Sequence, residues 1–182
     1  MNIQEVITAL NQMQVDGIVE RYAIGGAVGA TFYLEPVATL DVDVFITFKP
    51  QPGSLIVSPQ PIFDYFKTKG ATMEGEYIVI GGWPVQFLPA TSPLVEEALA
   101  QAGETDVEGT PARVFAPEYL AAIALQTGRT KDKARLLQFI EAGAYDPDRF
   151  QAVLAKHGLI ESWQKFERQL LSDSPCRLIC RR

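Results

Sequence analysis

Histidine and cysteine are scarce in this sequence. Its 182 residues include one histidine and two cysteines, and both cysteines, Cys176 and Cys180, lie near the C-terminal end. A structural zinc site takes several thiolate or imidazole ligands, and a disulfide scaffold takes several cysteine pairs. The composition therefore predicts neither kind of stabilisation. His157 precedes Gly158 at the end of a predicted helix, where we interpret it as a capping or surface residue.

Long apolar runs and an excess of positive charge are absent as well. No stretch approaches the length of a membrane span, and the first residues have no signal-like core, so we expect a cytoplasmic protein without a membrane segment. The net charge is −6, whereas proteins that bind nucleic acid over a broad surface usually have a basic face. The hydrophobic fraction of 47% provides enough apolar surface for a packed core.

A glycine pair, Gly25 and Gly26, separates the first predicted strand from a predicted helix. Residues 22–24 form the apolar run that predicts the strand, and the helix is expected over residues 27–34, where Pro36 would end it. The start of a helix leaves backbone N–H groups free, and glycine lets a ligand approach the backbone closely. Such a turn favours the binding of a phosphate group.

Asp41 and Asp43 lie in a second predicted strand, over residues 40–48. Side chains two apart on a strand point to one face, about 6.6 Å apart. Two carboxylates on one face can hold hard cations such as Mg²⁺ or Mn²⁺. A phosphate-binding turn beside such a pair indicates phosphoryl or nucleotidyl transfer. The alternative is an ordinary turn followed by solvated carboxylates; the glycine spacing does not fit a dinucleotide-binding fingerprint.

Gly25-Gly26 followed by Asp41-Val42-Asp43 resembles the hallmark of the DNA polymerase β-like nucleotidyltransferase superfamily, which is a Gly-Gly or Gly-Ser pair and, after a short spacer, Asp-x-Asp. Small members related to AbiEii-type toxins look most similar. The clear resemblance covers residues 20–48. It implies that both aspartates are catalytic and bind metal, and that both glycines bind the nucleotide.

The resemblance also implies a third metal ligand, because a third carboxylate often projects from a later strand in this family. We expect a hairpin over residues 76–88 that turns at Gly81-Gly82. Gln86 alternates with apolar neighbours on the return strand, in the place of that carboxylate. Its amide oxygen can bind a cation but carries no charge and cannot act as a base. Glu76, on the partner strand, is the alternative ligand.

A charged cluster follows in the C-terminal part. Arg129-Thr130-Lys131-Asp132 is similar to the Arg-x-Lys-Asp stretch of AbiEii-like proteins, which implies that Arg129 and Lys131 bind the nucleotide. A lysine at a helix start can neutralise a triphosphate. The alternative is a solvated first turn, with Thr130 as the N-cap and Asp132 complementing the helix dipole.

The expected fold class is α/β (α+β by some conventions), with a small mixed β-sheet nucleotidyltransferase core flanked by helices. A helix over residues 2–15 precedes the first strand, and Ser92 is expected to cap a later helix. From residue 116 onward the sequence predicts helices only. We therefore expect a nucleotidyltransferase-like core at residues 1–115 and a C-terminal helical region at residues 116–182 packed on it.

Two functions from different classes remain. In the favoured one, a nucleotidyltransferase that uses Mg²⁺ or Mn²⁺ moves a nucleoside monophosphate from a nucleoside triphosphate to an acceptor hydroxyl. The acceptor is an RNA, a protein or a small molecule. In the other, a catalytically weak or inactive nucleotide-binding module acts through an antitoxin-like protein partner. The two aspartates favour the enzyme, and the neutral Gln86 favours the binding module.

Overall fold

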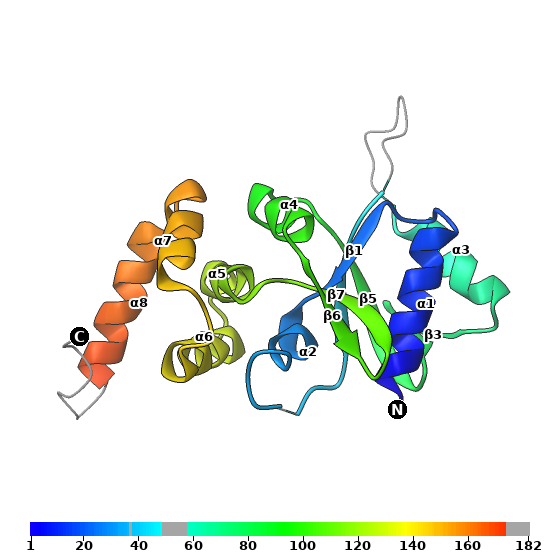
Figure 1. Cartoon of the computed structure of the whole chain (residues 1–182), viewed down its shortest axis with the longest axis horizontal. Coiled ribbons are helices and arrows are strands. Elements are labelled where there is room, and N and C mark those ends of the chain that lie inside the picture. The colour runs from blue at the N-terminus through cyan, green and yellow to red at the C-terminus, as the bar shows by residue number, and fades with distance from the viewer. Residues whose placement is uncertain (37, 49–57, 174–182) are drawn as a thin grey trace.

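The computed structural model describes residues 1–36, 38–48 and 58–173, and it has the expected α/β class (Figure 1). Within these residues a seven-stranded sheet has the order β3-β4-β5-β2-β1-β7-β6. The strands are β1 (Arg21–Ile24), β2 (Val42–Thr47), β3 (Thr72–Glu74), β4 (Tyr77–Ile80), β5 (Trp83–Pro89), β6 (Gly103–Val107) and β7 (Thr110–Val114). The β1–β7 and β2–β5 pairs are parallel and the others antiparallel, so the sheet is mixed, as expected.

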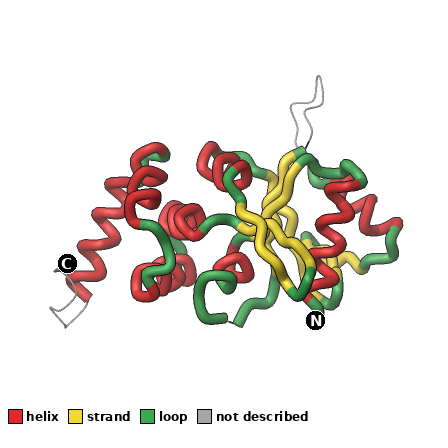
Figure 2. Tube along the Cα trace, viewed as in Figure 1, coloured by secondary structure: helices red, strands yellow, loops and turns green. Residues whose placement is uncertain are grey.

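Helices α1 (Ile3–Val15) and α3 (Gln60–Thr68) cover one face of the sheet (Figure 2). The side chain of Asn2 caps α1, because its oxygen accepts hydrogen bonds from the backbone N–H groups of Gln4 and Glu5. The apolar residues of α1 recur at helical spacing and meet the alternate strand residues Val42 and Val44 in one buried cluster. Alternation along β2 leaves its other side chains on the opposite face of the sheet.

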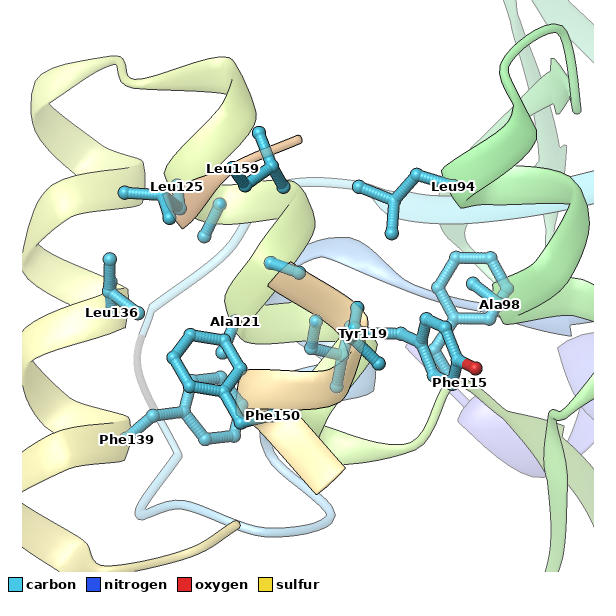
Figure 3. Packing of buried hydrophobic residues seen from close by; sticks show 14 of the residues in the cluster. Leu94, Ala98, Phe115, Tyr119, Ala121, Leu125, Leu136, Phe139, Phe150 and Leu159 are labelled. Carbon is cyan, nitrogen blue, oxygen red and sulfur yellow. The ribbon is translucent and has the colours of Figure 1, made fainter. Parts of the chain in front are cut away.

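The opposite face packs against helices α2 (Gly26–Ala30), α4 (Pro93–Ala100) and α5 (Pro117–Thr127). Helices α6 (Thr130–Ala142), α7 (Pro147–Lys156) and α8 (Ile160–Asp173) extend this layer away from the sheet (Figure 1). Residues of α5 such as Tyr119 and Ala121 lie between Leu94 of α4 and Phe139 of α6 (Figure 3). One hydrophobic cluster thus joins α4 to α8, and the division at residue 115 remains a prediction.

Local signals in the sequence located several turns and caps correctly. Gly81 and Gly82 join β4 to β5 and both have positive φ angles, 57° and 78°, so the predicted hairpin is confirmed. The hydroxyl oxygen of Ser92 accepts a hydrogen bond from the backbone N–H of Val95 at 3.3 Å and caps α4 as expected.

The helix expected over residues 27–34 is shorter than predicted, and Pro36 does not end it. α2 stops at Ala30, and Thr31 donates a side-chain hydrogen bond to the carbonyl of Val28 at 2.7 Å. Such local bonds compete with helix propagation, and the following residues form turns instead. The second strand also begins later than expected, at Val42, so that Asp41 lies just before it.

His157 caps a helix, as one of our two interpretations expected, but it is not a surface residue. It is the C-cap of α7, but its side chain is 7% exposed, and its Nε2 lies 2.9 Å from a carboxylate oxygen of Glu97 on α4. The short strand β3 was not predicted either. Cys176 and Cys180 lie outside the described residues. None of the described helices has the length and apolar character needed to cross a membrane.

Candidate active site

The strand register places Asp43, Gln86 and Tyr77 side by side. Asp43 of β2 pairs with Gln86 of parallel β5, and Gln86 pairs with Tyr77 of antiparallel β4. Their neighbours Val42 and Val85 are buried on the α1 side of the sheet. The three polar side chains therefore share the opposite face, where Asp43 and Tyr77 line a cavity between the sheet and helices α5 and α6.

The glycine pair adjoins Asp43 at the end of β1. The backbone N–H of Gly25 donates to the carbonyl of Asp43 at 2.9 Å. Gly26 has φ +57°, a left-handed conformation that glycine adopts readily, and a Cβ placed there would overlap the Asp43 carboxylate. The sequence needs glycine at this position because Asp43 occupies the space of a side chain.

Asp41 enters the cavity from the loop before β2. The hydroxyl of Thr39 lies 3.2 Å from the Asp41 carbonyl oxygen and 3.4 Å from its carboxylate Oδ1. Asp41 and Asp43 line the same cavity, as does Gly26. The predicted juxtaposition of the two carboxylates with the glycine turn therefore exists, although only Asp43 belongs to the strand.

The two aspartates repel each other across this site. Burial raises the pKa of Asp43, and the charge of Asp41 raises this pKa further. Arg135, Lys131 and Arg129 oppose the effect and lower the same pKa. A divalent cation between the carboxylates would relieve the repulsion, because it favours both ionised forms.

The basic side chains come from the first turns of α6. Arg129 is the N-cap, so the expected capping by Thr130 is wrong. The expected exposure of Asp132 is wrong as well, because its side chain is 3% exposed. The Nε of Arg129 donates to Oδ2 of Asp132 at 2.6 Å, and this short ion pair compensates the burial of the carboxylate. The rest of the first turn is solvated, as this alternative expects, because Thr130, Lys131 and Lys133 are exposed; only the capping by Thr130 and the exposure of Asp132 are wrong.

The cavity has a volume of about 950 Å³ and two chemically different walls. Asp41, Asp43 and Glu74 come from the sheet side, and Arg129, Lys131 and Arg135 come from α6. The pKa of Tyr77, on the acidic wall, is raised by desolvation and then by Asp41, Glu76 and Asp43. A smaller groove of about 380 Å³ between α1 and α3 contains none of these residues.

Sequence reasoning missed Arg135 and Tyr77. Arg135 follows Lys131 by four residues, a spacing that places two side chains on one helix face and could have identified it. Tyr77 has no signal in its own segment, and only its pairing with Gln86 in the hairpin places it in the site.

Gln86 is adjacent to Asp43 in the sheet, and Pro84 and Leu88, two residues before and after it on β5, line the cavity on either side of it. Glu76 lies in the β3–β4 turn, and its charge raises the pKa of Tyr77.

The cavity has too few metal-binding side chains to hold a cation by protein ligands alone. Among the described residues no group of three His, Cys, Asp or Glu side chains could hold a metal ion. Mg²⁺, however, is commonly bound through one or two carboxylates together with substrate phosphates and water. Asp41 and Asp43, beside a basic wall suited to phosphates, fit a cation that binds together with a nucleotide.

Comparison with known proteins identifies relatives by fold only. No protein-family model and no curated protein matches the chain. An antigenic nucleotidyltransferase-like protein from Paracoccidioides brasiliensis has a TM-score of 0.50 at 15% identity, over 96% of this chain and 94% of its own.

Two structures of ANT(2'')-Ia match as well. One, in complex with adenylyl-2''-tobramycin, has a TM-score of 0.52 at 14% identity, over 86% of this chain and 97% of its own. The other, a solution structure described as an antibiotic-resistance factor, has a TM-score of 0.51 at 14% identity, over 93% of this chain and 97% of its own. The more specific resemblance to AbiEii-type proteins remains a prediction. The chain has the fold of nucleotidyltransferase-like proteins.

Proposed function

We propose that the protein is a metal-dependent nucleotidyltransferase that moves a nucleoside monophosphate from a nucleoside triphosphate to an acceptor hydroxyl. The observation that carries this proposal is one cavity in which Asp41 and Asp43 face the cations of α6. A triphosphate needs positive charge for its phosphates and a cation beside its reacting phosphorus. The fold shared with nucleotidyltransferase-like proteins agrees with this assignment.

In the proposed reaction Asp41 and Asp43 hold one or two Mg²⁺ or Mn²⁺ ions. When bound, these ions neutralise phosphate charge and lower the pKa of the acceptor hydroxyl. Arg129 and Lys131 bind the phosphates from the opposite wall, where the N-terminal end of the 13-residue helix α6 adds partial positive charge. The acceptor oxygen attacks the α-phosphorus in line as its proton passes to solvent, and the bond to the leaving pyrophosphate breaks.

Gly25 and Gly26 have a steric role in this scheme. A Cβ at Gly25 would meet the rings of Phe45 and Phe115, and a Cβ at Gly26 would meet the Asp43 carboxylate, so glycine at both positions lets the turn lie against the strand that carries Asp43. Gly26 lines the cavity and offers its backbone to a phosphate there. α2 has only five residues, so we assign most of the phosphate attraction to the cations of α6.

RNA, protein and small molecules remain the candidate acceptors. One structural neighbour is named in complex with adenylyl-2''-tobramycin, which supports a small-molecule acceptor. The net charge of −6 and the acidic wall around Glu74 disfavour a polyanionic acceptor.

A second candidate function is a nucleotide-binding module that is weakly active or inactive and acts through a protein partner, as in a toxin–antitoxin pair. The observation that favours it is the position of Gln86 directly beside Asp43. A neutral amide there supplies neither charge for a second cation nor a general base.

Incubation with labelled nucleoside triphosphates, Mg²⁺ or Mn²⁺, and cell extract tests the two functions. The enzyme is expected to label an acceptor, and the variant Asp41→Asn with Asp43→Asn is expected not to. Calorimetry on the same samples tests binding. Metal-dependent nucleotide binding without any labelled product would support the binding module, and unchanged binding by the double variant would place the site elsewhere.

A further inference from the structure

Asp132 is a buried carboxylate that contacts two arginines of the cavity wall. It is 2% exposed. Arg129 donates to its Oδ2 at 2.6 Å, and the Nη1 of Arg135 lies 3.7 Å from its Oδ1. The second contact is too long for a hydrogen bond, so Asp132 orients Arg135 but leaves its donors available.

Arg135 has unused hydrogen-bonding capacity inside the protein. Its side chain is only 15% exposed, and its buried Nε has no hydrogen-bond partner within the described part of the chain. A buried N–H without a partner is unfavourable, and such groups are rare in folded proteins. Arg135 also lines the cavity, and its Nη1 is beyond hydrogen-bond distance of Asp132, so the outer end of the guanidinium can donate to a ligand there.

The charges around Arg135 indicate which ligand fits. Arg135 and Asp43 line the same cavity, yet the two side chains form no ion pair within the described residues. A space therefore separates Arg135 from the aspartates. Lys131 lies one helical turn away on the same face. A group that contacts both cations must be anionic, and one that also reaches the aspartates must be extended.

We propose that Arg135, oriented by Asp132, binds the terminal phosphates of the nucleoside triphosphate and makes the site selective for a triphosphate over a monophosphate. The proposal rests on the proposed function and adds a residue that sets the required length of the phosphate chain. Arginine suits this role because its planar guanidinium stays charged and binds phosphate oxygens in pairs. The departing pyrophosphate would keep the same contact.

Calorimetry with inorganic tripolyphosphate, ATP and AMP, using the full chain and Mg²⁺, tests the proposal. Arg135→Gln is expected to weaken the binding of tripolyphosphate and ATP by about 10- to 100-fold and to leave AMP binding unchanged. Arg135→Lys should lose less, because it keeps the charge but not the paired donors. Lys133→Gln is the matched control, since Lys133 lies on α6 but lines a groove toward α8.

Asp132→Asn separates orientation from charge. Removal of a negative charge beside the phosphates would by itself strengthen tripolyphosphate binding, whereas loss of the orienting contact weakens it. We expect weaker binding, with a smaller preference for ATP over AMP. Thermal unfolding shows whether Asp132→Asn folds. If it does not, the binding data for Arg135→Gln and Arg135→Lys still test the role of Arg135.

The outcomes distinguish this inference from the proposed function. Wild-type binding of tripolyphosphate and ATP with no loss in Arg135→Gln would overturn the role of Arg135 and leave the nucleotidyltransferase proposal intact. An equal loss of AMP and ATP binding would also overturn it, because the residue would then not recognise phosphate length. Absence of all binding by the wild-type protein, with Mg²⁺ or Mn²⁺, would overturn both.

Discussion

The carboxylate of Asp43 fills the position that a Cβ would take at Gly26. The glycine and the aspartate are therefore one structural unit, in which the turn is shaped to admit the acid. The sequence alone indicates that a side chain at position 26 would obstruct a phosphate. The structure adds that it would displace the carboxylate first.

Gly26→Ala should therefore impair metal binding and folding together. The left-handed backbone at residue 26 strains alanine, and the overlap moves Asp43, so we expect a loss of about 1–3 kcal/mol of unfolding free energy. Chemical denaturation and Mn²⁺ titration on the same sample measure both effects. Full Mn²⁺ affinity in a destabilised variant would show that Asp43 can adjust without leaving the site.

Asp43→Asn should weaken metal binding and raise the free energy of unfolding. Burial and the neighbouring Asp41 raise the pKa of Asp43, so the ionised side chain is unfavourable in the folded protein at neutral pH. In EDTA we expect a gain of up to about 1 kcal/mol, as for other functional residues that destabilise their fold. Metal-dependent nucleotide binding should fall by about 100-fold or more. A less stable variant in EDTA would mean that the cations of α6 already compensate the charge.

Gln86→Glu tests the neutral neighbour of Asp43. A third carboxylate on this face should tighten Mn²⁺ binding by about tenfold and lower the melting temperature without metal, because three acids then repel one another. If the protein is an enzyme, transfer should also rise. Unchanged Mn²⁺ affinity would show that the side chain at position 86 does not reach the cation. Gln138→Glu, on α6 at the cavity rim, controls for a general change in charge.

Glu97 should contribute stability that disappears in acid. Lys156, together with Tyr119 and His157, lowers the pKa of Glu97 below its usual value. The lowered pKa means that the folded protein favours the ionised acid, so the contribution is present above the ordinary pKa of glutamate and is lost as pH falls through the lower folded value. Glu97→Gln should cost about 1 kcal/mol at pH 7 and progressively less as the pH falls below the ordinary pKa of glutamate. The measurement is the free energy of unfolding of the wild-type and Glu97→Gln proteins as a function of pH. A difference between them that does not change with pH would contradict this prediction.

The parts of the site that were predictable from sequence are encoded by short segments. Gly25, Gly26, Asp41 and Asp43 lie within 20 residues of one another, and strand alternation with turn chemistry suffices to relate them. The hairpin at residues 81–82 and the Ser92 cap follow equally local rules. The end of α2 was not predicted from such rules, because the side chain of Thr31 bonds to the backbone there and competes with the helix.

The remaining parts depend on how distant elements pack. Asp132 looks like a favourable first-turn acid, and only the docking of α6 beside the sheet shows that it is buried. His157 meets Glu97 across 60 residues of sequence, a relationship without a local signature. Tyr77 joins the site through sheet register, and register is set by the complete sheet rather than by one strand.

The acidic and basic walls of the cavity come from segments that lie far apart in the chain, with Asp41 early and Arg135 later. During synthesis, a ribosome-bound chain that has not yet exposed α6 has its carboxylates but none of the cations that face them. Such a nascent chain has little means of capturing a triphosphate. If the protein binds a triphosphate as proposed, the order of the sequence delays its capture until α6 has been synthesised and has packed beside the sheet.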